Sequence, residues 1–170
     1  DWVLDPTLLL SKEDYISLFK DVCKEKSEGN LMTYILDYTE EKQGLIDVVE
    51  KQKGLKSFSL MAKENEEFPA IEKWLRGFYD AKFVLTDSFH GMVFSIIFEK
   101  PFLVVLNKQR GSSRFLSLLS ALGLEDRLIE NIDSFNLNLL DKEIDYERLR
   151  KRLFALVDRS KEFLINCLEK

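Results

Sequence analysis

Residues 81–98 of the chain read AKFVLTDSFHGMVFSIIF. The apolar run from Phe83 to Thr86 ends at polar residues, a pattern that predicts a short buried strand. The residues from Phe89 to Phe98 are nearly all apolar and include no proline, so we expect a buried helix. A strand, a tight polar turn and a helix place that turn at the carboxyl end of a sheet, where open α/β folds bind ligands.

The polar turn carries the residues best suited to chemistry. Asp87 and Ser88 are natural helix N-caps, because their side-chain oxygens can accept the first free backbone N–H groups. His90, the single histidine of the chain, follows at the predicted helix start. Gly91 has no side chain, so either a ligand or a packed neighbour can approach it closely. The turn is a candidate site, although a histidine at a helix start is also often only structural.

Strand-like and helix-like patterns alternate along the chain. Residues 1–10 look extended, and Ser11 can cap a first helix. Such alternation predicts an α/β, Rossmann-like three-layer domain with a mainly parallel sheet. We expect one domain over residues 1–170, with an opening segment and first helix (1–28), an α/β core (29–140) and a long C-terminal helix (141–170). The predicted strands are 31–36, 55–60, 83–86, 102–106 and 127–132, and helices are predicted over 40–53, 68–79, 89–98 and 115–122.

Composition excludes several classes of protein. The chain has 170 residues, 45% of them hydrophobic and 32% charged, which suits one folded domain. Its net charge of -5 provides no positive field to attract nucleic acid. The two cysteines form no cluster with the histidine, so we expect no metal site and a reducing, cytoplasmic setting. No run of about 18 apolar residues predicts a membrane span.

A basic loop after the predicted strand 102–106 is a second candidate site. Lys108, Arg110 and Arg114 lie around Gly111. Guanidinium groups suit phosphate and carboxylate, and the N–H groups at the start of the next helix add positive potential. The alternative is a solvated basic loop with no ligand. We expect this loop to lie on the same rim of the sheet as His90, because parallel strands end at the same edge.

The run TDSFHG at 86–91, followed by VFSI at 93–96, resembles the hallmark of the polysaccharide pyruvyl transferase family. The resemblance covers most of residues 1–140. It looks like the C-terminal half of such an enzyme, in which two Rossmann-like domains face a cleft as in GT-B-like enzymes; this chain would supply the second domain. Further pieces in the family's order are DPTLLL at 5–10, WL at 74–75, PF at 101–102, RGSSR at 110–114 and LGLEDR at 122–127.

This resemblance implies an enzyme that transfers a pyruvyl group from phosphoenolpyruvate to two hydroxyls of one sugar, forming a ketal. The acceptor would be a sugar, free or lipid-linked, of a cell-surface or exported polysaccharide, and no cofactor is called for. His90 is implied as the catalytic acid. The enzyme would be cytoplasmic, at most peripheral to a membrane, and this chain without an N-terminal domain would be inactive. The residues expected to bind substrate are Asp87, Ser88, Gly91, Lys108, Arg110 and Arg114, the basic ones on charge and location alone.

Two alternatives belong to other classes. The chain can instead be the donor-binding half of a nucleotide-sugar glycosyltransferase, in which case it should bind nucleotides. It can also be a non-catalytic Rossmann-like module. Replacing Phe94, a predicted core residue, should then matter far more than replacing His90.

Overall fold

The computed structural model describes residues 2–62, 67–107 and 111–169, and it shows an α/β protein around one parallel sheet. The strands lie in the order β2-β1-β3-β4-β5, and every neighbouring pair is parallel. The Rossmann-like three-layer prediction is thereby confirmed. The strands are β1 (Leu31–Tyr34), β2 (Ser57–Phe58), β3 (Phe83–Thr86), β4 (Phe102–Val105) and β5 (Leu128–Ile129).

The helices follow the predicted order, with one correction near the start. The segment before Ser11 is not simply extended, because Pro6 begins a short 3-10 helix that Asp5 caps. Proline suits the first helical position, where its fixed φ is helical and its missing N–H costs nothing. The helices are α1 (Lys12–Phe19), α2 (Glu40–Lys53), α3 (Ile71–Asp80), α4 (Phe89–Ile97), α5 (Ser112–Leu122) and α6 (Tyr146–Leu168), with 3-10 turns η1 (Pro6–Leu9), η3 (Glu125–Arg127) and η4 (Leu137–Leu140).

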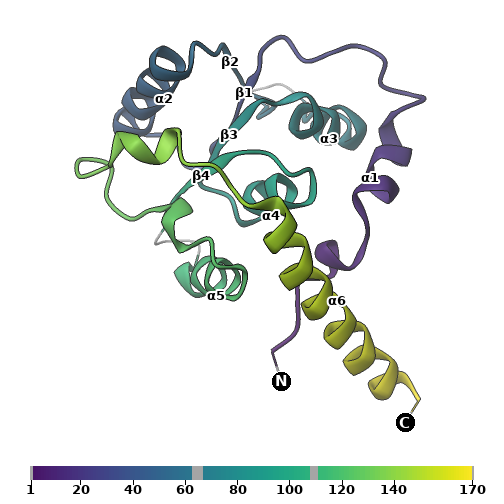
Figure 1. Ribbon diagram of the computed structural model, residues 1–170. Helices are drawn as coiled ribbons and strands as arrows, with labels where there is room; N and C mark the ends of the chain where they lie inside the picture. Colours follow the sequence, from purple (N-terminus) through teal and green to yellow (C-terminus); the bar gives the residue numbers. More distant parts are fainter. Residues whose placement is uncertain (1, 63–66, 108–110, 170) are drawn as a thin grey trace.

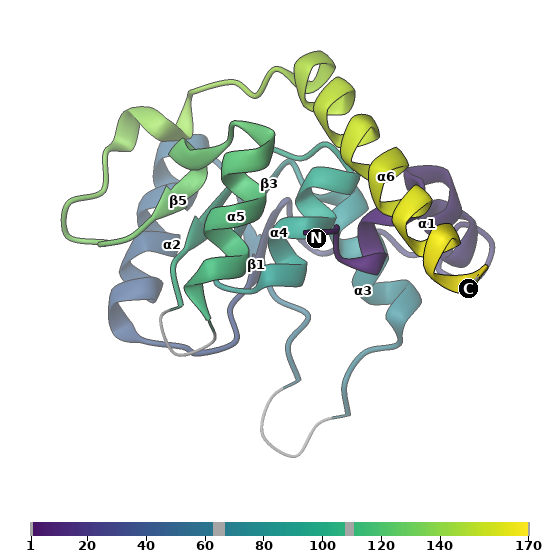
Figure 2. The ribbon, with the colours of Figure 1, turned by 90° about the horizontal axis from the view of Figure 1, so that it is seen from below.

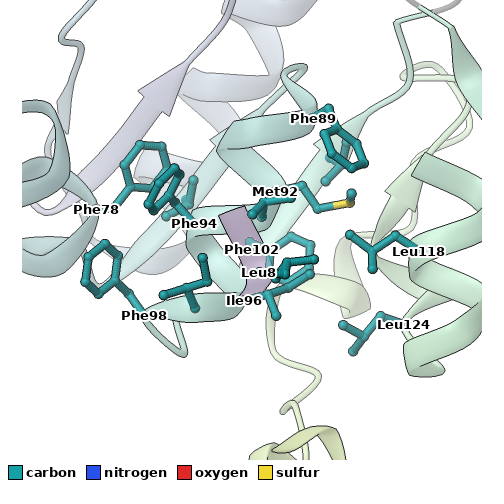
Figure 3. Packing of buried hydrophobic residues seen from close by; sticks show 14 of the residues in the cluster. Leu8, Phe78, Phe89, Met92, Phe94, Ile96, Phe98, Phe102, Leu118 and Leu124 are labelled. Atoms are coloured by element: carbon teal, nitrogen blue, oxygen red, sulfur yellow. The ribbon is translucent and has the colours of Figure 1, made fainter. Parts of the chain in front are cut away.

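Two apolar clusters cover the two faces of the sheet. Along β3, Phe83 and Leu85 join the smaller cluster, which α2 covers, whereas Val84 joins the larger one. This alternation follows from the two-residue repeat of a strand. Figure 1 shows α2 and α3 on opposite sides of the strands. In the larger cluster, Met92 of α4 lies close to Phe102 of β4 (Figure 3).

The order in which the chain adds strands to the sheet changes direction at β1. The chain runs outward from β1 to β2, then returns to the other side of β1 to place β3, β4 and β5. In open α/β sheets the crevice at such a reversal, outside the carboxyl ends of the strands, is where ligands bind. The turn that carries His90 follows the carboxyl end of β3 directly, so it lies at this crevice.

The N-terminal segment packs against the C-terminal helix. The backbone N–H of Leu4 donates a hydrogen bond of 3.0 Å to Oγ of Ser160 in α6. The turn η1 packs against both α4 and α6 (Figure 2). The N-terminal segment is thus held beside the helix that carries His90.

None of the helices within the described residues combines the length and the apolar character that a membrane span requires.

Candidate functional site

The turn after β3 depends on a close contact between Thr86 and Gly91. Oγ1 of Thr86 donates to the backbone carbonyl of Tyr34 at 2.6 Å and accepts from the backbone N–H of Ser88 at 3.0 Å. A Cβ at position 91 would collide with that side chain. Of the two roles considered for Gly91, the structure shows the packing one, since the residue is buried and lets α4 approach β3.

Ser88 caps α4 as predicted, but Asp87 does not. Oγ of Ser88 accepts the backbone N–H of Gly91 at 3.3 Å. The carboxylate of Asp87 instead accepts the backbone N–H groups of Leu36 at 2.6 Å and Asp37 at 3.1 Å. These two amides bond to a side chain and not to a neighbouring strand, which explains why β1 ends at Tyr34, before the predicted residue 36.

The buried carboxylate of Asp87 is the centre of a polar network, which we define as Asp37, Lys42, Asp87 and Asn107. Nζ of Lys42 donates to the Asp87 carboxylate at 2.7 Å and to the backbone carbonyl of Asp37 at 2.6 Å. Nδ2 of Asn107 donates to the carboxylates of both Asp37 and Asp87. The network therefore ties together the chain just beyond the carboxyl ends of β1, β3 and β4. Sequence analysis missed Lys42, because an amphipathic helix gives no sign that one of its lysines is buried.

His90 is the residue of this turn that reaches the surface. It lies in the first turn of α4, and 52% of its side chain is exposed. Its Nε2 lies 3.8 Å from Oδ2 of Asp5, the residue that caps η1. Sequence analysis treated Asp5 only as part of a family resemblance. The available signal was local: an acidic residue directly before a proline is a natural helix cap.

Arg114 is brought to the same place from α5. Its guanidinium carbon lies 4.8 Å from the centre of the Phe89 ring, within the range of a cation–π contact. Partial burial acts to raise the pKa of Asp5, but hydrogen bonds with Thr7 and electrostatic interactions with His90 and Arg114 lower it below its usual value. The structure thus gathers His90, Arg114 and Asp5 from three distant parts of the sequence.

The other basic candidates cannot be placed in the same way. Lys108 and Arg110 lie outside the described residues. The residues on either side of them, Asn107 and Gly111, follow the carboxyl end of β4 and precede α5. Their assignment to an anion site stays a prediction from charge and position.

His90 also borders an apolar pocket of about 390 Å³. Phe68 and Ile71 are exposed there, at 73% and 57%. Sequence analysis did not find this pocket, because its members come from four separate segments. His90 thus borders this apolar pocket and also has a polar side, where it faces Asp5 with Arg114 nearby. The residues that line the pocket are Tyr34, Leu60, Phe68, Pro69, Ile71, Trp74, His90 and Phe94.

Among the residues that the structure describes, no three His, Cys, Asp or Glu side chains form a group that could hold a metal ion. The carboxylates closest to the site, Asp5 and Asp87, are engaged by protein donors. The site described above thus offers one imidazole, one guanidinium and one carboxylate at the surface.

Comparison with known families gives a match over the first part of the chain. A family model described as polysaccharide pyruvyl transferase matches residues 2–109, which is more than half of the chain. The matched range contains Asp5, the turn with His90 and most of the apolar cluster, whereas Arg114 lies just beyond it. Comparison with curated proteins gives no match, and comparison with solved structures gives none either.

Proposed function

The chain belongs to the polysaccharide pyruvyl transferase family, and we propose that it transfers a pyruvyl group from phosphoenolpyruvate to two hydroxyls of one sugar. The products are a cyclic ketal on the sugar and inorganic phosphate. The observation that carries the proposal is the position of His90. It is a half-exposed imidazole at the carboxyl edge of the sheet, inside the family match. Asp5 and Arg114 lie nearby, and the imidazole also borders an apolar pocket.

The reaction requires one acid and a local positive charge. Carbon 3 of phosphoenolpyruvate gains a proton and becomes a methyl group, while carbon 2 forms bonds to two acceptor oxygens and loses its bond to phosphate. One hydroxyl proton restores the acid, and the other leaves with the phosphate. A positioned side chain must therefore supply a proton at carbon 3. Cationic groups must oppose the charges of the carboxylate and of the departing phosphate.

His90 fits the first requirement and Arg114 the second. The positive end of α4 disfavours a protonated imidazole, whereas a bound phosphate or carboxylate favours it. His90 should therefore be a good acid when the anionic donor is in place. A planar guanidinium suits both anionic groups of that donor. Lys108 and Arg110, predicted to lie on the loop before α5, would add to this charge.

The acceptor sugar and a second domain complete the proposal. The exposed Phe68 and Ile71 beside His90 form a surface that a further domain can cover. We infer that this chain is the C-terminal domain of a two-domain, GT-B-like enzyme and that its N-terminal domain supplies most of the acceptor site. The acceptor, free or lipid-linked, would belong to a cell-surface or exported polysaccharide, modified in the cytoplasm.

The first test is the substitution His90→Gln in the full-length protein. Phosphate release and ketal formation are measured with phosphoenolpyruvate and a panel of sugars. Glutamine keeps a hydrogen-bonding group of similar size but cannot act as the acid, so kcat should fall by about 10²–10⁴-fold with little change in the donor KM. Arg159→Ala, an exposed substitution on α6, is the control. Unchanged turnover in the His90 variant would refute the role of the imidazole.

The second test concerns donor binding by Arg114. Arg114→Ala removes a guanidinium from the polar side of His90 and should raise the donor KM, by an amount equivalent to about 2–3 kcal/mol for a charge-assisted contact. The KM for the sugar should change much less.

Binding of a nucleotide sugar by the full-length protein, with no response to phosphoenolpyruvate, would instead favour a glycosyltransferase.

A further inference from the structure

The two carboxylate oxygens of Asp5 have different surroundings. Oδ1 accepts the backbone N–H of Thr7 at 3.0 Å and thereby caps η1. Oδ2 lies 3.8 Å from Nε2 of His90, an ion-pair distance when the imidazole is protonated. One oxygen is thus used by the fold, while the other faces the ring. Such a division fixes the direction of the second oxygen, because the first cannot rotate away without losing the cap.

The segment around Asp5 is fixed by its packing. Leu4 and Leu8 are buried on either side of it, and the N–H of Leu4 bonds to Ser160. The hydroxyl of Tyr15 donates to the backbone carbonyl of Thr7 at 2.8 Å. A group that positions a catalytic side chain must itself be held in place. Asp5 meets this condition although it lies near the beginning of the chain.

The charges around His90 come from two elements besides α4. Asp5 approaches from the segment that leads into η1, and Arg114 approaches Asp5 from α5. On the far side of Asp5 lies Tyr15 of α1, whose pKa is raised by burial and by the charges of Asp5 and Asp14. In the part of the chain that the structure describes, Asp5 is therefore the carboxylate paired with His90.

We propose that Asp5 is a positioning residue for His90, which orients the imidazole and keeps its proton in place until the donor is attacked. The inference rests on the proposed function, because it assigns Asp5 a part in the same reaction. A carboxylate next to an imidazole favours the protonated form. It also opposes the positive end of α4, which disfavours that form. Asp5 thereby supplies part of the negative charge that the acid needs before the donor arrives.

The variant Asp5→Asn separates this role from capping. Asparagine caps helices as well as aspartate does, so η1 should stay intact, whereas the charge is lost. In the full-length protein, kcat should fall by about tenfold or more. The donor KM should stay equal or decrease, because a negative charge near Arg114 has been removed. The pH profile of kcat should also change, because the variant lacks the carboxylate that faces the imidazole. Asp5→Glu should restore part of kcat.

Asp14→Asn is the matched control, since Asp14 pairs with Ser11 at the start of α1. It should leave kcat and the pH profile unchanged. A second readout needs no turnover: this chain has one histidine, so its imidazole NMR signals report on His90 alone. They should change in Asp5→Asn and not in Asp14→Asn. If the imidazole signals change in Asp5→Asn while the full-length protein transfers no pyruvyl group, the pairing of Asp5 with His90 is supported and the proposed function is wrong. If His90→Gln abolishes turnover but Asp5→Asn leaves kcat, the pH profile and the NMR signals unchanged, the inference about Asp5 is overturned.

Discussion

At the scale of single residues, Gly91 determines how closely α4 can approach β3. An added methyl group would collide with the side chain of Thr86, whose hydroxyl bonds to both Tyr34 and Ser88. Gly91→Ala should therefore lower the free energy of unfolding by about 1–3 kcal/mol, as overpacked substitutions do. Urea denaturation measures this loss.

The matched control for that substitution is Gly44→Ala in α2. A Cβ at Gly44 meets no atom within 4 Å. Alanine there should stabilise the protein by about 0.5–1 kcal/mol, because glycine is a poor residue inside a helix. If the two alanine variants changed the free energy of unfolding equally, the Thr86 side chain would be able to move away from the added methyl group without loss of stability.

Residue-scale prediction from sequence succeeded where the chemistry is local. The cap at Ser88 was predicted correctly, because a cap needs only its own neighbours. The structure places His90 at the predicted strand–helix turn, and its catalytic role stays a prediction. Asp87 was predicted as a cap and is not one, since the amides it accepts come from the end of β1. The approach of Asp5 to His90 joins two distant segments, and no spacing along the chain encodes it.

At the scale of elements, Lys42 connects α2 to the carboxyl edge of the sheet. Both Lys42 and its partner Asp87 are buried. Lys42→Ala would leave a buried carboxylate without its counter-charge, so the free energy of unfolding should fall by about 3–5 kcal/mol. Thermal and urea unfolding of the variant provide the measurement.

Another lysine of the same helix provides the comparison. Lys53 pairs with Asp141, whose side chain is 83% exposed. Lys53→Ala should cost only about 0–1 kcal/mol, as is typical of ion pairs in water. If the two lysine variants lose similar stability, the Asp87 network does not hold the strand ends together.

The elements themselves were largely predictable, apart from their ends. The bounds of α2 agree with prediction, because Thr39 and Gly54 mark its two ends by local chemistry. The edge strand β2 is much shorter than the predicted 55–60, since it pairs with only two residues of β1. Strand length depends on the partner strand, which a single sequence does not show.

At the scale of the whole molecule, carboxylates that the fold stabilises should make unfolding depend on pH. The pKa of Glu50 is lowered by hydrogen bonds with Ser57, including one of 2.6 Å from its backbone N–H. A lowered pKa means that the unfolded chain binds more protons than the folded one. The contribution of Glu50 to the free energy of unfolding is therefore fully present above its pKa in the unfolded chain, about 4.3, and is lost as the pH falls through its pKa in the folded protein. Glu50→Gln should weaken the fall in stability between about pH 5 and pH 3, measured by urea denaturation at each pH. An identical pH dependence in the variant would show that the contact with Ser57 does not persist in solution.

The overall architecture followed from the alternation of strands and helices, whereas the site did not. Alternation predicts parallel strands, and parallel strands place their carboxyl ends on one edge. It does not predict that β3 lies beside β1, which brings Tyr34 into the pocket that His90 borders. The pocket therefore depends on that strand order.

The hydrogen bond between Leu4 and Ser160 has a consequence for biosynthesis. Leu4 leaves the ribosome long before Ser160, and chains of this kind begin to fold while they are still being made. The sheet from β1 to β5 can assemble on the nascent chain, but the segment that carries Asp5 gains its last support only when α6 has emerged from the exit tunnel. A polypeptide stalled before that point would have its parallel sheet and its exposed imidazole while the partner of that imidazole was still loosely held.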